Sequence, residues 1–356
     1  MSYGIHLAER RLLPDAIIRY GIRRLQQGRL FREGMGFCEG KNRAKRGFID
    51  EMNRSPIAVH TKAANEQHYE LPPEFFVHVM GDHMKYSCCY YPKGDETLSQ
   101  AEAAMLALTC ERAEIDNGQK ILELGCGWGS LTLWMAKRYP HSEITAVSNS
   151  VPQRRFIEHQ CKERGLMNVN VITADMNDFE TDDTFDRVVS VEMFEHLRNY
   201  GAMLRRIAGW LNDDGKVFIH VFSHRNFPYR FEAKGDNDWM GRLFFTGGIM
   251  PSDDLFLYFQ DDVSIEDHWV VDGRHYAKTA DAWLENMDQN RDEVMKILNR
   301  HYGQQDGKLW FQRWRIFFMA CSELWGFDKG QEWWVSHYLF QKKAVNVLES
   351  TSILSS

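Results

Sequence analysis

The middle of the chain alternates short apolar runs with amphipathic stretches, and this alternation limits the possible folds more than any other feature. The apolar runs have the length of buried strands and lie at residues 120–124, 143–147, 169–173, 185–191 and 216–222. Helical periodicity separates them at residues 130–138, 152–165 and 200–211. Because strands that alternate with helices at this spacing pair in parallel, the predicted fold class is α/β with a doubly wound sheet.

The composition is that of a folded protein and excludes several classes. The chain has 356 residues, of which 44% are hydrophobic, so a sizeable core is available. A net charge of −7 counts against general nucleic-acid binding. Seven Cys are too few for a disulfide scaffold, which favours a reducing, cytoplasmic location. We find no signal peptide and no run near the roughly 18 apolar residues of a membrane span.

The first 46 residues are strongly basic, whereas the rest of the chain is acidic. They hold nine Arg and two Lys against four acidic residues, a net charge of +7, which leaves −14 for the other 310 residues. Apolar residues recur at helical spacing from Leu12 to Leu25, with Pro14 and Asp15 near the start. We expect a helix with one apolar stripe and Arg opposite. Its basic face can pack on the acidic remainder of the chain or touch anionic lipid.

Changes in pattern divide the chain into five parts. These are a helical N-terminal extension (1–75), the core with the alternating elements (76–225), an inserted segment (226–278), C-terminal helices and a strand that complete the core (279–347), and a flexible tail (348–356). The inserted segment is rich in aromatic and acidic residues. We expect it to cap the substrate side of the sheet.

A glycine-rich loop follows the first predicted strand and marks a ligand site. Ligands of open α/β sheets bind beyond the carboxyl ends of the strands, where this chain has Gly125, Gly127 and Gly129. A dinucleotide is disfavoured, because the third glycine of its fingerprint is absent and Glu123 would repel a pyrophosphate. An acid at this place suits a cationic ligand. S-adenosylmethionine (SAM) fits, because it has a sulfonium and an amino group and no phosphate.

Polar residues after the second and third predicted strands complete this site. Asn149 and Gln153 follow the second strand, and their amides can hydrogen-bond the hydroxyls of a ribose. Asp175, with Met176 beside it, follows the third strand, and its carboxylate can accept the amine of an adenine. Each signal alone also fits an ordinary turn. All three in order favour an adenosyl ligand.

Four segments of the chain resemble a known family. They are ILELGCGWGSLTLWMAKRY, AVSNSVPQ, ADMNDF and FDRVVSVEMFEHLRNYG, and they are similar to the class I SAM-dependent methyltransferases. More narrowly, residues 65–343 resemble the cyclopropane fatty acid synthase family and its plant relatives, the coclaurine-type and tetrahydroprotoberberine-type N-methyltransferases. The resemblance implies a Rossmann-like fold. It also implies that Tyr86 and Ser87 contact the methionine end of SAM.

An acidic cluster follows the fourth predicted strand. If this segment forms a helix, Glu192, Glu195 and His196 share one face. Together they could take a proton from an amine, which attacks only when neutral. The resemblance to the plant enzymes implies Glu195 and His196 as base and orienter, and Glu192 as the anchor of the cation. The leading prediction is methyl transfer to the nitrogen of a small or aromatic amine, and a charged helix start is the plainer alternative.

A second set of residues favours a different acceptor. Cyclopropane synthases use a bicarbonate as base, held by a Cys, a Glu, a His and a Tyr, and the matching residues are Cys88, Glu195, His220 and Tyr276. The resemblance therefore also allows methylene transfer to a lipid alkene with bicarbonate as a further cofactor. His220 can equally be a buried core histidine and Tyr276 a packing residue. Both acceptors stay open, with a non-catalytic SAM-binding protein as a third alternative.

Other partners are less constrained by the sequence. An aromatic amine would suit the aromatic and acidic residues of the inserted segment, although these can also form core. They are Asp238, Trp239, Phe244, Phe245, Tyr258, Phe259, Asp261 and Asp262. We expect Trp325, Trp333 and Trp334 in the core. No metal is expected, because no Cys or His pair has ligand spacing. A homodimer is compatible with the sequence, and membrane contact is expected to be peripheral at most.

Overall fold

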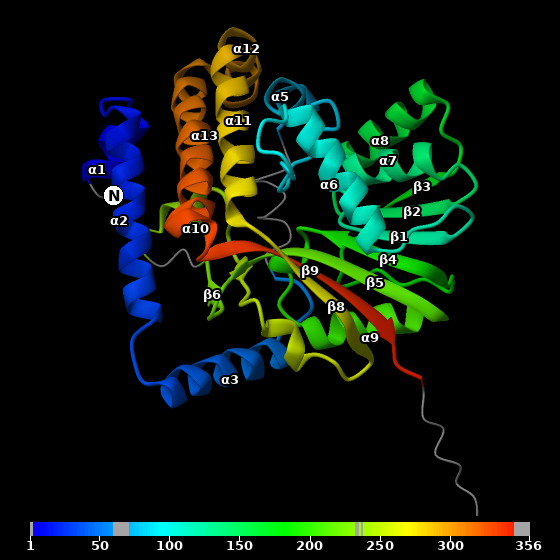
Figure 1. The fold of residues 1–356 in the computed structure, drawn as a ribbon. Helices are drawn as coiled ribbons and strands as arrows, with labels where there is room; N and C mark the ends of the chain where they lie inside the picture. The colour runs from blue at the N-terminus through cyan, green and yellow to red at the C-terminus, as the bar shows by residue number, and fades with distance from the viewer. Residues whose placement is uncertain (1–2, 60–70, 232–234, 236–237, 345–356) are drawn as a thin grey trace, which may run out of the picture.

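A seven-stranded sheet forms the centre of the molecule. The computed structural model describes residues 3–59, 71–231, 235 and 238–344, and orders the strands β3-β2-β1-β4-β5-β9-β8 (Figure 1). The strands are β1 (Lys120–Leu124), β2 (Glu143–Ser148), β3 (Val169–Thr173), β4 (Phe185–Val191), β5 (Leu211–His224), β8 (Val263–Val271) and β9 (Trp333–Lys342). β1 to β5 pair in parallel, and β9 is antiparallel to both of its neighbours. This confirms the predicted α/β class.

Helices cover both faces of the sheet. One face carries α6 (Leu98–Arg112), α7 (Ser130–Arg138) and α8 (Val151–Arg164), and the other carries α9 (Tyr200–Trp210) (Figure 1). Local chemistry sets their ends. Thr97 and Gln100 form a capping box at the start of α6, Ser150 caps α8, and Gly165 ends α8 with φ +66°. The predicted helix bounds therefore lie within a residue of those observed.

The inserted segment predicted at 226–278 does more than cap the sheet. It contains β6 (Tyr229–Arg230), α10 (Trp239–Leu243), β7 (Ile249–Met250) and the short turn η2 (Leu255–Tyr258), and then continues into β8. β8 is the edge strand of the main sheet, and it was not predicted from the sequence. Its middle residues are exposed and polar, so it lacks the continuous apolar run that marks strands buried on both faces.

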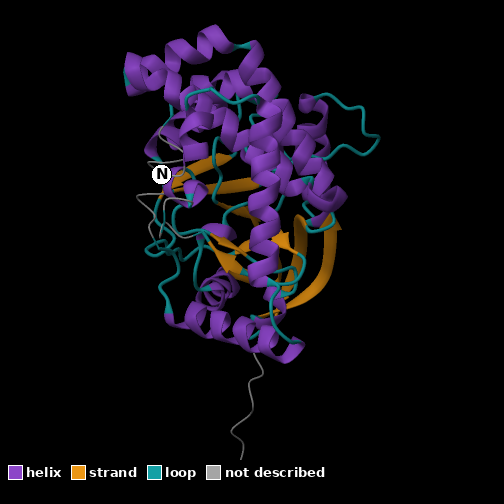
Figure 2. Ribbon diagram, turned by 90° about the vertical axis from the view of Figure 1, so that its left-hand side faces the viewer, coloured by secondary structure: helices purple, strands orange, loops and turns teal. Residues whose placement is uncertain are grey.

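A layer of helices connects β8 to β9. α11 (Gly273–Gln289), α12 (Arg291–Tyr302) and α13 (Gln304–Trp325) stand beside α5 (Pro73–Val79) on one side of the sheet (Figures 1 and 2). The turn η3 (Phe327–Gly330) then leads into β9, the strand expected to complete the core. This layer carries the largest apolar cluster of the molecule together with α5.

The N-terminal helices only partly match the predicted amphipathic helix. α1 (Tyr3–Glu9) and α2 (Asp15–Glu33) precede α3 (Cys38–Arg54). Ile18 is buried, but Ile17 and Leu25 are 52% and 60% exposed, so the predicted apolar stripe is wrong at these positions. α2 also docks through charge, because Arg19 pairs with Asp281 and Glu323 of the helical layer. The expected packing of basic residues on the acidic remainder of the chain is confirmed there.

Two further expectations concern the C-terminal tail and membrane-spanning segments. The predicted tail at 348–356 lies outside the described residues. Among the helices that are described, none is both long and apolar enough to cross a bilayer.

Candidate active site

The glycine loop after β1 is shaped by close packing at two glycines and by open space at the third. A Cβ on Gly125 would lie 2.6 Å from Met193, and a Cβ on Gly129 would lie 2.6 Å from Ile157. Both glycines also have φ +80°, a left-handed conformation that other residues rarely adopt. Gly127 has no atom within 4 Å of its ideal Cβ. Its open face leaves room for a ligand to approach the backbone.

A cavity of about 70 Å³ lies against this loop, and we call it the glycine-loop cavity. Its lining includes the predicted residues Tyr86, Ser87, Glu123, Gly125, Gly127 and Glu192. Glu123 is buried and accepts a hydrogen bond from Thr132 Oγ1 at 2.5 Å. Burial raises the pKa of Glu123 to about 8. A cationic ligand group would therefore stabilise the carboxylate that burial disfavours.

The residues predicted to hold an adenosine lie at the ends of β2 and β3. Gln153 is buried, accepts a hydrogen bond from Ser148 at 2.6 Å, and leaves its Nε2 without a partner among the described residues. Asn149 is exposed beside it. Asp175 accepts two hydrogen bonds from Asn177, from the backbone N–H at 2.8 Å and the side-chain amide at 2.9 Å. Met176 is half-buried against the core.

A second cavity of about 110 Å³ lies next to the first and is lined mostly by aromatic and apolar side chains. We call it the aromatic cavity. Its lining includes Phe222, Phe231, Phe245, Trp283, Phe317 and Trp325. Tyr86 and Glu192 line both cavities. His196 and Tyr276 line the aromatic cavity but not the glycine-loop cavity. A group passed from one cavity to the other would thus pass beside Glu192.

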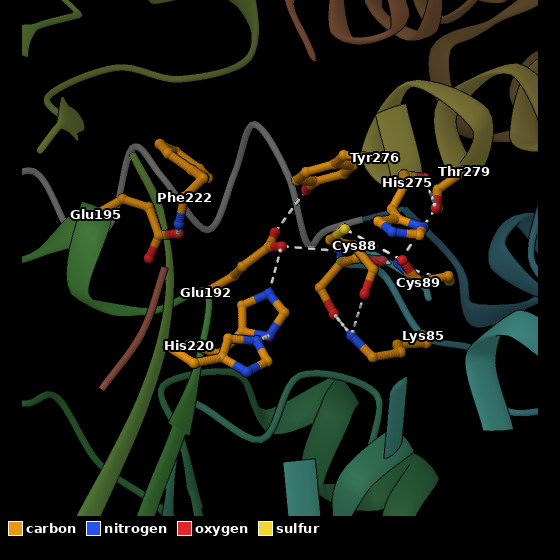
Figure 3. Close-up of polar contacts among 12 residues, drawn as sticks. Lys85, Cys88, Cys89, Glu192, Glu195, His220, Phe222, His275, Tyr276 and Thr279 are labelled. Carbon is orange, nitrogen blue, oxygen red and sulfur yellow. Dashed lines mark hydrogen bonds and ion pairs between the residues drawn. The ribbon is translucent and has the colours of Figure 1, made fainter. Parts of the chain in front are cut away.

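Glu192 is held at this junction by three hydrogen-bond donors from distant parts of the chain (Figure 3). The Cys88 N–H donates to Oε1 at 2.9 Å, and His220 Nε2 lies 3.2 Å from the same oxygen. The Tyr276 hydroxyl donates to Oε2 at 2.6 Å. Glu192 itself has φ +48°, a strained conformation for a residue with a side chain. The protein therefore fixes this carboxylate against a local conformational cost.

The charge of Glu192 reflects opposing influences. Burial raises its pKa, whereas the nearby charge of Lys85 and the hydrogen bonds from Cys88 and Tyr276 act in the opposite direction. Burial also raises the pKa of the Cys88 thiol well above its usual range, so this side chain stays neutral. Cys88 thus contributes its backbone N–H to the site.

Glu195 and His196 do not form the helix face that the sequence suggested. Only a short turn, η1 (Phe194–His196), follows the left-handed Glu192, so the helix on which a shared face depended does not form. The Glu195 carboxylate lies against β5, where its Oε1 accepts the Phe222 N–H at 3.3 Å (Figure 3). Burial, then the charge of Glu192, raises the pKa of Glu195 well above its usual range. Burial lowers the pKa of His196 to about 4, which leaves it neutral.

The aromatic residues around the site differ from those predicted. Of the eight aromatic and acidic residues named in the inserted segment, Phe245 lines the aromatic cavity. Trp239, for example, donates a hydrogen bond to Glu9, and Asp262 pairs with Arg205. Trp325 is buried in the core as expected, and it also lines the cavity and stacks on Tyr276 with ring centroids 4.7 Å apart.

The sequence analysis missed two polar residues beside the site. Lys85 is buried, donates to the Ser87 hydroxyl and to the Cys88 carbonyl at 2.8 Å, and lines the glycine-loop cavity. His337 lies opposite His220 on β9 and is fully buried. The sequence feature that could have identified Lys85 and His337 is a titratable residue within a buried segment. That signal does not by itself show which site the residue serves.

The site fits SAM on three observations: the open face of Gly127, the buried acid Glu123, and the unpartnered amide of Gln153. A crystal structure of coclaurine N-methyltransferase bound to N-methylheliamine and S-adenosylhomocysteine (SAH) is similar, with a TM-score of 0.91 and 38% identity over 95% of this chain and 98% of that one. The fold and the site thus define a class I SAM-dependent methyltransferase.

The family follows from the sequence comparisons. A family model described as mycolic acid cyclopropane synthetase matches residues 58–331, and the chain belongs to this family. The (S)-coclaurine N-methyltransferase of Thalictrum flavum subsp. glaucum is 39% identical over 93% of each chain. The cyclopropane-fatty-acyl-phospholipid synthase of Escherichia coli (strain K12) is more distant, at 29% identity over 62% of this chain and 55% of its own.

Proposed function

We propose that this enzyme transfers the methyl group of SAM to the nitrogen of an amine bound in the aromatic cavity. The observation that carries the proposal is the carboxylate of Glu192 at the junction of the two cavities. A buried carboxylate attracts an ammonium, and the aromatic walls suit a cation attached to a ring. The N-methyltransferases among the relatives support the same acceptor class.

The residues of the glycine-loop cavity, together with those that follow β2 and β3, would hold the methyl donor. Gly125, Gly127 and Gly129 shape the loop, and Glu123 would face the cationic amino acid end with Tyr86 and Ser87. Asn149 and Gln153 would bind the ribose, and Asp175 with Met176 the adenine. When bound, SAM supplies an electrophilic methyl on a sulfonium that leaves as a neutral thioether.

The side chains of the aromatic cavity would prepare the acceptor. Glu192 would bind the incoming ammonium, and its carboxylate, whose pKa burial raises, would accept the proton as the amine becomes neutral. His196 lines the same cavity as a neutral imidazole and would orient the amine. The free lone pair of the nitrogen then points toward the methyl group. Glu195 would keep its own proton and support the turn through the Phe222 N–H, because it contacts neither cavity. Glu195 would thus act from behind the reacting groups as a positioning residue.

The geometry disfavours bicarbonate-dependent methylene transfer to a lipid alkene. Cys88, His220 and Tyr276 were the predicted donors to a bicarbonate, yet all three contact the carboxylate of Glu192. A bicarbonate from solution would therefore compete with the carboxylate of Glu192 for the same three donors. We propose that Glu192 fills the role of the external anion, and that no bicarbonate is needed.

Methyl-labelled SAM tests the proposed acceptor. The enzyme is incubated with a panel of aromatic secondary amines and with phospholipids that contain unsaturated chains, each with and without bicarbonate. We expect label on the amines regardless of bicarbonate. Label on lipid alone, dependent on bicarbonate, would replace this proposal with the cyclopropane synthase reaction. Label on neither the amines nor the lipids would favour the third alternative, a non-catalytic SAM-binding protein.

Removal of the Glu192 carboxylate gives the sharper test. We expect Glu192→Gln to lower kcat/KM for the amine by about 100-fold or more, since a charged hydrogen-bonded contact is lost, with SAH affinity within a few-fold. Glu192→Ala leaves three donors without an acceptor, so formate or bicarbonate should restore part of the activity. Glu158→Gln, which changes an exposed acid on α8, is the control. Full activity of Glu192→Gln would refute the assigned role.

A further inference from the structure

A chain of hydrogen-bonded side chains runs from Glu192 through two buried histidines to the half-buried Arg112 at the end of α6. His220 and His337 are directly opposite residues of β5 and β9, and both are 0% exposed. His337 Nε2 lies 2.9 Å from His220 Nδ1, and Arg112 Nη1 lies 2.8 Å from His337 Nδ1. His220 Nε2 completes the chain at Glu192 Oε1, 3.2 Å away. Each imidazole thus has a partner on both nitrogens.

Arg112 fixes the direction of every hydrogen bond in this chain. A guanidinium has donors only, so His337 must accept at Nδ1 and carry its proton on Nε2. That proton is donated to His220 Nδ1, which leaves the His220 proton on Nε2, facing Glu192. Both histidines are neutral, because burial, and next the charges around them, including that of Arg112, lower the pKa of each well below its usual value.

We propose that Arg112 and His337 are positioning residues for methyl transfer, which lock His220 as a permanent hydrogen-bond donor to the carboxylate of Glu192. The inference rests on the role proposed for Glu192. It assigns a function to residues that contact neither cavity. The guanidinium of Arg112 also stacks over Trp269 at 5.0 Å, which holds it in place.

One consequence concerns the route of the proton. A chain that ends on a guanidinium cannot pass a proton outward, because Arg112 has no lone pair to receive one. The proton taken from the substrate must therefore leave on the side of His196 and the aromatic cavity. The His220–His337 pair is an electrostatic support and not a proton wire.

The acid limb of the pH profile of kcat/KM should depend on the hydrogen bond from His220 to Glu192. Glu192 is faced by charged or titratable groups from each element around it. These are Lys85 and Cys88 from the segment before α6, Glu195 and His196 from η1, His220 from β5, Tyr276 from α11 and Cys321 from α13. Loss of the fixed donor would raise the pKa of Glu192 while the other groups stay unchanged. The acid limb should then move to higher pH.

Variants of Arg112 test the proposal by kinetics. In Arg112→Met, we expect kcat/KM near neutral pH to fall about tenfold, as for a lost hydrogen bond to a charged group, and the acid limb to move up. Arg112→Lys keeps a donor and a charge and should restore most of the activity. Arg187→Met is the matched control, because Arg187 contacts the carbonyls of Ala113 and Glu114 at the end of α6 and neither histidine. An unshifted acid limb in Arg112→Met would overturn the proposal.

The spectrum of the unmodified protein gives a second test that needs no turnover. In protein labelled with ¹⁵N at histidine, we expect His220 and His337 to carry protons on Nε2 and bare Nδ1 atoms. Their signals are assigned from His220→Gln and His337→Gln. A proton on Nδ1 of either residue would contradict the proposal even if the enzyme methylates amines. If both histidines carry the predicted protons but the enzyme does not methylate amines, the hydrogen-bond chain stands and the proposed function is wrong.

Discussion

At the scale of the residue, the proposed reaction depends on the carboxylate of Glu192 and on the donors that hold it. The donors that contact it come from the segment before α6, from β5 and from α11. With a carboxylate at this place, the site favours cations and has its own anion. Without it, the same donors would be free to bind an anion from solution. The identity of this residue therefore bears directly on the acceptor class.

Glu123 should make cofactor affinity depend on pH. Its pKa is about 8 without ligand, and a nearby ligand cation would lower it, so binding expels a proton. The affinity for SAH should therefore weaken by about tenfold between pH 7 and pH 6, where the free carboxyl is protonated. Titration calorimetry over pH 6–8 measures this. Glu123→Gln should flatten the dependence, and an unchanged slope in that variant would place the titrating group elsewhere.

Substitutions at Glu195 separate a positioning role from that of a base. We expect Glu195→Ala to lower turnover by about 100-fold with SAH still bound, because the turn loses its contact with β5. Glu195→Gln preserves an acceptor for the Phe222 N–H and resembles the protonated acid, so its turnover should stay within about tenfold of the unmodified enzyme. If the two variants are equally inactive, Glu195 acts as a base and the role proposed here is wrong.

At the scale of the element, the segment that precedes Tyr86 depends on one buried acid of α6. Glu102 is 0% exposed and accepts the backbone N–H groups of Gly81, His83 and Lys85 at 2.8–3.1 Å. These bonds fold the segment against α6. They also deliver Lys85 and Tyr86 to the glycine-loop cavity, so the same acid supports both the fold and the site.

Loss of Glu102 should therefore affect stability and cofactor binding together. Glu102→Ala leaves one buried and two partly buried donors without an acceptor, and we expect a loss of about 3 kcal/mol in the free energy of unfolding. Denaturant titration measures this, and SAH affinity should fall in parallel. Glu96→Gln, at a partly exposed acid that accepts the N–H groups of Lys93 and Gly94, is the control. A stable Glu102→Ala variant would show that the segment is held by other contacts.

At the scale of the whole molecule, the N-terminal helices and the helical layer are joined through a buried arginine. Arg315 of α13 binds Asp15 at the start of α2 and Asp288 near the end of α11, with contacts of 2.6–3.0 Å. Its side chain is 5% exposed. Because α13 and α11 also form walls of the aromatic cavity, α2 supports the acceptor side of the site from behind.

Arg315→Met should weaken this junction in a pH-dependent way. We expect a loss of about 2 kcal/mol near pH 7, because two carboxylates lose their partner but can rehydrate. The hydrogen bond from Arg315 is the main reason that the pKa of Asp15 lies below its ordinary value of 3.8. That stabilisation is complete above pH 3.8 and is lost as the pH falls below it. The stability difference from the unmodified protein should thus narrow in acid.

Melting curves from pH 7 to pH 3 measure this difference. Arg23→Met, at an exposed pair with Glu323, should cost under about 1 kcal/mol and serves as the control. A stability difference that is constant with pH would show that Arg315 acts through packing alone.

The α/β class, the position of the glycine loop and the methyl donor could all be predicted from the amino-acid sequence. Those features depend on local chemistry: apolar runs of strand length, helix caps, and glycines required for turns and close packing. The exposed polar strand β8 and the outward Ile17 escaped prediction, because their environments depend on what packs beside them.

The way in which the two candidate catalytic sets combine could not be predicted, because it depends on long-range contacts of the folded chain. His220 and Tyr276 lie 28 and 84 residues after Glu192, and no local pattern indicates that they contact it. The parallel register that pairs Val191 with His220 brings one of them to the site, and the docking of α11 brings the other. The same contacts hold Glu192 in a left-handed conformation, which is why the predicted helix face does not form. Long-range packing overrides local propensity where a side chain gains several buried partners at once.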